Sequence, residues 1–384
     1  MKPLAGIRIL ELARILAGPW AGQLLADLGA EVIKVERPIE GDDTRHWGPP
    51  FLTDAEGRPR DAAYFHAANR GKRSIAIDLA SPQGQAEVRA LAARADVVIE
   101  NFKLGALARY GLDHAGLSAV NPRLVTCSIT GFGQTGPYAH RAGYDFIIQA
   151  MAGAMSLTGE PDGPPEKAGV AYADIFTGLY ATVAILAALR RRDATGQGAH
   201  IDMALMDAQV AVLANQALNF MATGIAPTRM GNAHPNLVPY QSFRTADGDI
   251  IVAVGNDRQF AKLCAILGLD ALAEDERFRT NAGRVTNRAE LIPLLAEAIA
   301  VWPRATLAAR LEAEGVPGGP INPLDAVFAD PQVTARGLAL SLEEGLPGLA
   351  CPIVIDGERQ NANRAAPHLD ADGAAVRKEL KAGG

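Results

Sequence analysis

The feature of this sequence that most constrains its fold is an alternation of short apolar segments with helical segments along the N-terminal part. Strands are predicted at Gly6–Leu12, Ala30–Glu36, Ser74–Leu79, Asp96–Phe102 and Leu124–Phe132. A helix is predicted at Trp20–Leu28, and a second one starts after the capping residue Ser81 and ends at Ala93. Strands that alternate with helices predict a doubly wound α/β domain with a parallel sheet.

The chain changes character near its middle, where a second lobe is predicted. With 384 residues, 48% of them hydrophobic, it has more apolar sequence than one core usually holds. From His200 to Gly224 a strand continues into a long apolar helix. A β-hairpin follows, with strands at Gln241–Arg244 and Asp249–Val254. Helices come next, so this lobe is predicted to be α+β: Arg258–Leu267, Arg288–Ile299 and Thr306–Glu314.

Charge and cysteine content limit the partners that we expect. The net charge is -6, and charges of both signs are scattered, which argues against a nucleic-acid or membrane-surface partner. The chain does not begin with a signal-peptide pattern, and its histidines form no metal-binding motif, so no metal is expected. We interpret the cysteines as reduced core residues of a cytoplasmic protein: Cys127, Cys264 and Cys351.

The obvious alternative for an α/β fold of this kind is a nicotinamide or flavin enzyme. Glu36 ends the second predicted strand, where an acid that binds a ribose would lie. However, the first turn has the sequence AGPWAG instead of G-x-G-x-x-G, and Pro19 stands where the backbone should approach a pyrophosphate. The sequence therefore disfavours dinucleotide binding, and fold class alone assigns no function.

A nearly uninterrupted apolar segment from Ala171 to Arg190 predicts a helix that is buried on all sides. We interpret it as a core helix, because it is too short and too rich in alanine for a membrane span. Its first turn contains one carboxylate, Asp174, whose ionised form the helix end would favour. Local sequence leaves two interpretations open: a helix cap, or a shielded carboxylate that attacks an acyl group.

A compact basic turn, Asn69–Ser74, precedes the third predicted strand. Lys72 and Arg73 beside backbone amides would suit a phosphate, but the same residues are typical of a solvated surface turn. Farther along, Leu157–Gly169 is rich in turn-forming residues and leads toward Asp174. That segment is either one that closes over a site or an ordinary surface connection.

Several blocks, spread over nearly the whole chain, carry a resemblance to one family. They are Leu16–Pro38, Gly41–Arg45, Asn69–Leu79, Ala95–Gly105, Ile129–Tyr138, Ala142–Phe146, Ala171–Ala181 and Phe328–Val333. Through them the chain resembles the class III CoA-transferases, the family of formyl-CoA, carnitine and bile-acid CoA-transferases. Many blocks in the same order are more specific than a single motif.

The resemblance implies a Rossmann-like large domain that is built from both ends of the chain, with a smaller α+β domain between them. On this basis we expect the large domain at residues 1–222, the small domain at residues 223–321 and a return to the large domain at residues 322–384. It also implies that two ring-like subunits interlock as a homodimer.

The resemblance implies a covalent role for Asp174. In the family, the matching carboxylate attacks the thioester of an acyl-CoA, so that an aspartyl anhydride and then an aspartyl-CoA thioester form. CoA thioesters would be substrates, and no cofactor would be permanently bound. The positions that match the family's CoA contacts are Arg37, Lys72, Asn101, Phe102, Arg109 and Arg141.

One position separates this chain from a sister group, the α-methylacyl-CoA racemases. Those enzymes have a His in the block that matches Ala142–Phe146, where it acts as acid and base. This chain has Tyr144 there, and a phenol does not readily replace an imidazole near neutral pH. The resemblance therefore favours CoA transfer, with racemisation as the alternative.

A second departure concerns the substrate. Formyl-CoA transferases carry a glycine-run loop that covers the aspartyl intermediate, whereas this chain has Val254–Phe260. Gly255 and Asn256 are expected to take over part of that role. Together with the segment Gly231–Gln241, this departure resembles the members that use succinyl-CoA as donor and a dicarboxylic acid such as glutarate as acceptor.

Overall fold

The computed structural model of the protein describes residues 1–382, which form two compact units. The first unit contains residues 1–154, 167–225 and 331–382, and the second contains residues 155–166 and 226–330. These boundaries differ from the expected domains at three places. The main part of the second unit begins at residue 226 instead of residue 223. Residues 155–166 belong to the second unit, and the chain returns to the first unit at Pro331 instead of residue 322.

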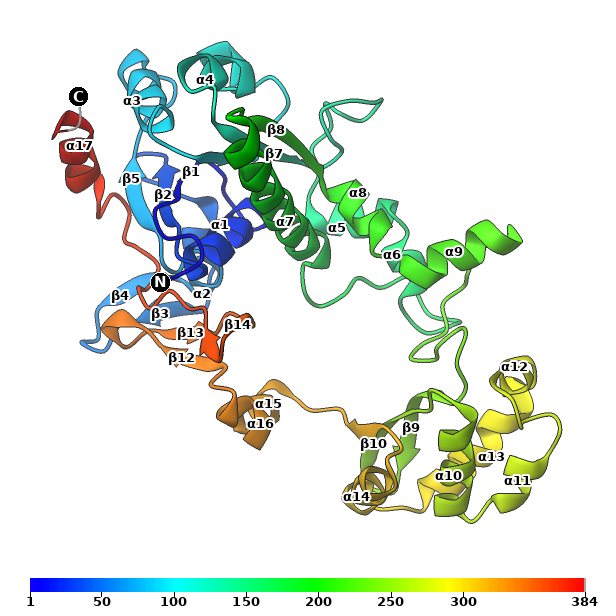
Figure 1. Cartoon of the computed structure of the whole chain (residues 1–384). Coiled ribbons are helices and arrows are strands. Elements are labelled where there is room, and N and C mark those ends of the chain that lie inside the picture. The colour runs from blue at the N-terminus through cyan, green and yellow to red at the C-terminus, as the bar shows by residue number, and fades with distance from the viewer. Residues whose placement is uncertain (383–384) are drawn as a thin grey trace. The chain divides into compact units, whose positions relative to one another are not determined.

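The first unit is built on a six-stranded sheet with the order β5-β2-β1-β6-β7-β8, in which neighbouring strands are parallel. Figure 1 shows this sheet between layers of helices, which confirms the predicted doubly wound α/β fold with a parallel sheet. The order reverses direction between β1 and β6, and such a reversal opens a crevice at the carboxyl ends of the two strands. The strands are β1 (Arg8–Glu11), β2 (Glu31–Glu36), β5 (Arg73–Ala76), β6 (Val97–Glu100), β7 (Val125–Thr130) and β8 (Ala199–Ala204).

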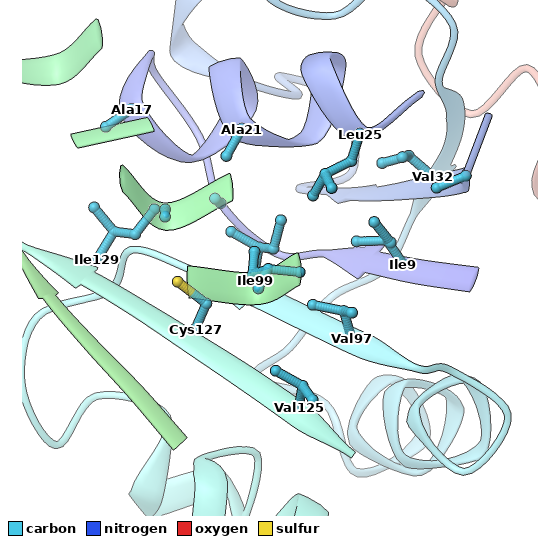
Figure 2. Close-up of a cluster of buried hydrophobic side chains, with 14 of the residues drawn as sticks. Ile9, Ala17, Ala21, Leu25, Val32, Val97, Ile99, Val125, Cys127 and Ile129 are labelled. Atoms are coloured by element: carbon cyan, nitrogen blue, oxygen red, sulfur yellow. The ribbon is translucent and has the colours of Figure 1, made fainter. Parts of the chain in front are cut away.

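Helices cover both faces of the sheet, and each face has its own apolar core. On one face, α1 (Ala17–Asp27) and α7 (Tyr172–Thr195) pack over Ile9, Ile99 and Cys127, as Figure 2 shows for the α1 side. On the other face lie α3 (Pro82–Ala92), α4 (His114–Val120) and α17 (Gly373–Ala382). As predicted, Ser81 caps α3, and its hydroxyl accepts a hydrogen bond from the amide of Gly84 at 3.0 Å. The three cysteines are buried and free, as expected.

Helix α7 differs from its prediction in both length and burial. It has 24 residues, so by length and hydropathy it could cross a membrane, and the argument that it is too short is wrong. Ala181, Ile185 and Leu189 are buried in the core that the helix shares with the sheet. The prediction of burial on all sides is also wrong, because the side chain of Val183 is 63% exposed. One face of α7 therefore packs on the sheet, and the opposite face is open.

The long helix that was expected to end at Gly224 is two helices. They are α8 (Leu205–Ala211) and α9 (Ala214–Thr223), and α8 packs against α5 (Asp145–Met151) in the first unit. Helix α6 (Ala154–Leu157) lies at the boundary between the two units in the sequence. The segment after Pro38 also contains regular structure: η1 (Asp43–His46), β3 (Phe51–Thr53), β4 (Pro59–Ala62) and α2 (Ala63–His66). The C-terminal part adds η3 (Glu343–Gly345), α16 (Pro331–Ala335), β12 (Ala339–Ser341) with β13 (Pro347–Leu349), and β14 (Val354–Ile355) with β15 (Glu358–Arg359).

The second unit has its own sheet and core. The predicted hairpin is present as β9 (Tyr240–Thr245) and β10 (Gly248–Ala253), and β11 (Gly318–Pro320) adds a third antiparallel strand. Phe243, Phe260 and Leu291 lie in the apolar core between this sheet and the helices. The helices are α10 (Asp257–Leu267), α11 (Asp270–Glu274), α12 (Asn281–Thr286), α13 (Arg288–Ala300), α14 (Arg304–Glu314) and α15 (Leu324–Ala329).

Candidate active site

Two adjoining cavities of the first unit lie where β1 and β6 end. Their volumes are about 310 and 300 Å³, and Arg14, Phe102 and Ala106 line both of them. We call the larger one the first cavity and the other one the second cavity. Arg14 follows the carboxyl end of β1, and Phe102 and Ala106 follow that of β6. The cavities therefore occupy the crevice at which α/β sheets of this order bind their ligands.

Asp174 lines the second cavity from the first turn of α7. The helix begins after Ala171, which has no capping side chain. The cap comes instead from α5, where Oδ1 of Asp145 accepts a hydrogen bond from the amide of Ala173 at 2.9 Å. Among residues 1–382, the Asp174 carboxylate accepts no hydrogen bond from the protein. The interpretation of Asp174 as the helix cap is thus wrong, and its oxygens are left for a ligand.

The surroundings of Asp174 make its charge costly. Burial, and secondarily the negative charge of Asp145, raise the pKa of Asp174 to about 7. The sequence had suggested that the helix end would favour ionisation, and burial outweighs that effect. A carboxylate with this pKa is a stronger nucleophile than an ordinary aspartate, and it is still substantially ionised at neutral pH.

Two polar residues of α5 hold the start of α7, and the sequence analysis assigned neither a role. Oδ2 of Asp145 accepts a hydrogen bond from Nε2 of Gln149 at 2.7 Å. Oε1 of Gln149 in turn accepts one from the amide of Ala168 at 3.0 Å. This chain of hydrogen bonds fixes the backbone on both sides of residue 171 and so fixes where Asp174 enters the cavity. Asp145 stood in the quoted block Ala142–Phe146, but Gln149 gave no sequence signal.

A third residue that the sequence analysis missed is Tyr64, on α2. Burial, and after it the charges of Asp174 and Asp145, raise the pKa of Tyr64 to about 12. Its hydroxyl therefore keeps its proton at neutral pH and can act as a hydrogen-bond donor near Asp174. Its ring lies edge-on to that of Trp47, with 5.2 Å between the ring centroids. Local sequence offers no signal for this residue.

A close helix contact sets the distance between α7 and the turn after β1. A Cβ added to Gly178 would lie 2.8 Å from the carbonyl oxygen of Ala17 and 3.1 Å from Cδ1 of Trp20. Any larger residue would push α7 away from the first turn of α1. Ala17 lines the same cavity as Asp174, so this glycine brings two walls of the second cavity together.

The predicted CoA contacts divide between the two cavities. Arg37 and Arg109 line the first cavity, Phe102 lines both, and Asn101 and Arg141 line the second. Nη2 of Arg37 lies 2.9 Å from Oδ1 of Asp43, and the Arg37 side chain is about half exposed. Of the predicted contacts, two arginines thus line the first cavity and one lines the second, and Phe102 lines both.

Lys72 is a correction to the predicted contacts. Its side chain is fully buried, and its ammonium group lies 2.8 Å from Oε2 of Glu11. The same group donates to the carbonyl of Pro19 at 2.8 Å and to Oδ1 of Asn69 at 2.9 Å. With these partners Lys72 does not reach a phosphate; it holds the turn between β1 and α1.

The remaining predicted residues lie in different units. Tyr144 lines the second cavity, and its side chain is 59% exposed. Gly255 and Asn256 belong to the second unit, where Oδ1 of Asn256 accepts a hydrogen bond from the amide of Gln259 at 3.0 Å and caps α10. Their predicted role over the site stays a prediction. Within residues 1–382, no cluster of three or more His, Cys, Asp or Glu side chains is placed to hold a metal.

The sequence of the chain matches the family described as CoA-transferase family III over residues 4–373. The chain belongs to this family. Its fold agrees, because a solved structure described as a CAIB/BAIF family protein from Brucella suis superimposes with a TM-score of 0.88 at 59% identity, covering 99% of each chain. This CoA-transferase thus carries its Asp174 and its two cavities on a scaffold that solved members share.

Three relatives are named for their reactions. The chain is 56% identical to a succinate–glutarate CoA-transferase of Agrobacterium fabrum, over 99% of this chain and 96% of the relative. It is 45% identical to a succinyl-CoA:glutarate CoA-transferase of Homo sapiens, over 91% of this chain and 78% of the relative. An acetyl-CoA:oxalate CoA-transferase of Acetobacter aceti is 38% identical over 99% of this chain and 96% of the relative.

Proposed function

We propose that this enzyme moves CoA from succinyl-CoA to a dicarboxylic acid such as glutarate, with Asp174 as the covalent nucleophile. The observation that carries the proposal is a carboxylate without a protein hydrogen-bond donor, raised in pKa, on the wall of a cavity that also contains cationic side chains. A group of this kind is poised to react with an acyl carbon.

The reaction proceeds in four exchanges. One oxygen of Asp174 attacks the succinyl carbonyl, and CoA leaves as a thiolate, so that a mixed anhydride forms. The thiolate attacks the Asp174 carbonyl carbon, which gives an aspartyl-CoA thioester and releases succinate with one former Asp174 oxygen. The acceptor carboxylate displaces CoA and forms a second anhydride. The thiolate then attacks the acceptor's carbonyl, and Asp174 is restored with one oxygen from the acceptor.

Each exchange replaces one activated acyl bond with another, so no ATP is consumed. Both kinds of intermediate would hydrolyse in open water, and the partial burial of Asp174 at the start of α7 limits that access. The backbone amides at the start of α7 and the Tyr64 hydroxyl are candidate donors for the oxyanion that develops at each attack.

The CoA moiety would extend from the second cavity into the first. Arg37 and Arg109 would contact the phosphates, and the Phe102 ring would pack on an apolar part of CoA. Arg141 would contact the part of CoA nearest Asp174. Lys72 is not included, because its ammonium group is buried.

A dicarboxylic substrate needs a cation for the carboxylate that does not react. Arg14, Lys103 and Arg141 line the second cavity together with Asp174. The cavity therefore supplies cations for the substrate carboxylate that does not react. The printed names of the relatives agree with this substrate class. We expect glutarate to be used about ten-fold or more faster than pentanoate, which lacks the second carboxylate.

We also propose a homodimer. Apolar side chains are exposed along α5, α7 and α9 of the first unit, and α9 has no buried residue within the described chain. Leu218 and Met221 of α9 are 65% and 73% exposed. An exposed apolar surface of this extent is typical of a protein–protein interface, and the resemblance to the family favours a second copy of the chain as the partner.

Oxygen-18 tests the covalent route. The acceptor glutarate is labelled in its carboxylates and mixed with succinyl-CoA and a molar excess of enzyme, so that each site turns over once. The proposal predicts one labelled oxygen in the Asp174 peptide and none in the released succinate. Label in the succinate of the first turnover would mean that the acceptor attacks succinyl-CoA directly, and the proposal would be overturned.

A further inference from the structure

Segment Arg14–Ala17, which joins β1 to α1, has a backbone conformation that its sequence disfavours. Ile15 has a φ of 72°. A β-branched residue rarely adopts this left-handed region, because its Cβ crowds the following carbonyl. The segment contains no glycine that would adopt the conformation freely. Contacts from outside the segment must therefore hold Ile15 in place.

Asn101 supplies one of these contacts from across the crevice. Oδ1 of Asn101 accepts a hydrogen bond from the amide of Arg14 at 3.0 Å, and Nδ2 donates to the Arg14 carbonyl at 2.6 Å. Asn101 directly follows β6, and Arg14 lies shortly after β1. The side-chain amide thus ties the two loops together at the point where the strand order reverses.

Asp42 supplies the second contact, from the segment that follows β2. Both of its carboxylate oxygens lie 3.2 Å from the amide nitrogen of Ile15. Oδ2 is also 2.9 Å from Nζ of Lys34, which in turn donates to the carbonyl of Ala13 at 2.9 Å. Burial alone would raise the pKa of Asp42, but Lys34 and the Thr44 hydrogen bonds lower it to about 2. Asp42 is therefore charged and fixed under working conditions.

The held segment forms part of the wall around Asp174. Ile15, Leu16 and Ala17 line the second cavity. Leu16 precedes α1 and has no side-chain cap, and among residues 1–382 the amides of Leu16 and Ala17 donate to no protein acceptor. If Ile15 relaxed to a negative φ, these amides and the Arg14 side chain would move relative to Asp174.

We infer that Asn101 and Asp42 are positioning residues of the transfer reaction: they hold Ile15 in a left-handed conformation and thereby fix the segment Arg14–Ala17, which lines the same cavity as Asp174. The inference rests on the proposed role of Asp174. It gives Asn101 a part that differs from the direct CoA contact that the family resemblance implies, because both ends of its amide group are bonded to Arg14.

A double-mutant cycle tests the inference. Asn101→Ala is made in the wild-type chain and in an Ile15→Asn chain, since Asn adopts the left-handed region far more readily than Ile. The readout is the single-turnover rate of CoA release from saturating succinyl-CoA, together with the Kd for CoA. We expect Asn101→Ala to slow release about ten-fold in the wild type but about three-fold or less in the Ile15→Asn chain. The Kd should change little in both.

The inference would be overturned if Asn101→Ala slowed CoA release equally in the two backgrounds, or if it weakened CoA binding instead. Asn101 would then be a direct CoA contact. Ile15→Gly repeats the cycle without a new polar side chain. The control is Asn121→Ala, which removes comparable hydrogen bonds to the backbone at Ala92 and Ala95, away from both cavities; it should leave the rate unchanged. If the wild type itself releases no CoA in a burst and forms no Asp174 adduct, the covalent mechanism fails. That failure is distinguishable from equal losses in the two backgrounds, which would overturn only the roles of Asn101 and Asp42.

Discussion

At the scale of single residues, the site depends on the different surroundings of two neighbouring carboxylates, Asp145 and Asp174. Asp145 accepts hydrogen bonds from Ala173 and Gln149, whereas Asp174 accepts none from the described protein. The charge of Asp145 helps to raise the pKa of Asp174. The same residue type therefore has two functions, which its surroundings determine.

This division of roles predicts a pH dependence. Because the attacking form of Asp174 is the carboxylate and its pKa is about 7, kcat/KM for succinyl-CoA should fall as the pH drops through 7. Asp145→Asn removes the neighbouring negative charge, so the pKa of Asp174 should fall. The decrease of kcat/KM at acidic pH should then occur at lower pH. Activity at pH 6 relative to pH 8 should rise roughly two-fold or more.

Asp193→Asn, at the exposed far end of α7, is the control for the Asp145→Asn experiment. It should leave the pH at which kcat/KM falls unchanged. If the pH dependence of kcat/KM does not change in Asp145→Asn, a group other than Asp174 governs it.

Sequence reasoning located Asp174 but misjudged its charge and the role of Lys72. A basic turn before a strand is normally solvated, and its local sequence does not reveal that Glu11, 61 residues away, is buried beside it. Likewise, the helix end suggested an ionised Asp174, whereas its pKa depends on burial by elements that the fold brings together. Both errors arise because burial is set by long-range packing.

At the scale of helices and strands, the site depends on how closely α7 approaches α1. The alternating strands and helices, the Ser81 cap and the β9–β10 hairpin could all be predicted, because each follows from local periodicity or turn chemistry. The exposed face of α7 could not, since composition does not distinguish a face that packs on the sheet from one that is left open. Gly178 lies on the packed face and permits the approach.

Gly178→Ala tests this contact. The added methyl group would meet the Ala17 carbonyl at 2.8 Å, a backbone atom that does not move without shifting α1. We expect a roughly ten-fold or larger loss of transfer activity and a loss of about 1 to 3 kcal/mol in the free energy of unfolding. Activity and thermal unfolding are measured on the same preparation.

Gly319→Ala is the matched control, because a Cβ there meets nothing within 4 Å. Wild-type activity in Gly178→Ala would mean that the α1–α7 distance is not what positions Asp174.

At the scale of the whole molecule, the parallel sheet and the family membership agree with the sequence-based expectation. The strand order could not be read from the sequence, although it determines where the crevice lies. The division into units also differs in detail, because residues 155–166 join the second unit through contacts that local sequence does not reveal, such as Arg229 to the carbonyl of Gly163 at 2.7 Å.

The proposed homodimer makes a prediction at this scale. Wild-type protein should sediment as a dimer at micromolar concentration. Leu218→Asp combined with Met221→Asp should shift it toward monomer, because the charges would be buried in the interface. Val301→Asp, at a residue that is 77% exposed in the second unit, is the control and should remain dimeric. A monomeric wild type would contradict the proposal.

The most direct test of Asp174 as nucleophile is to trap the covalent enzyme. The protein is mixed with succinyl-CoA and quenched in hydroxylamine, which converts an activated carboxyl group to a hydroxamate, and the mass is mapped to peptides. If Asp174 is the covalent nucleophile, a hydroxamate will be found on Asp174 in the wild type and none in Asp174→Ala. An unmodified Asp174 in an enzyme that still transfers CoA would contradict it, and the carboxylate would then have a role other than nucleophile.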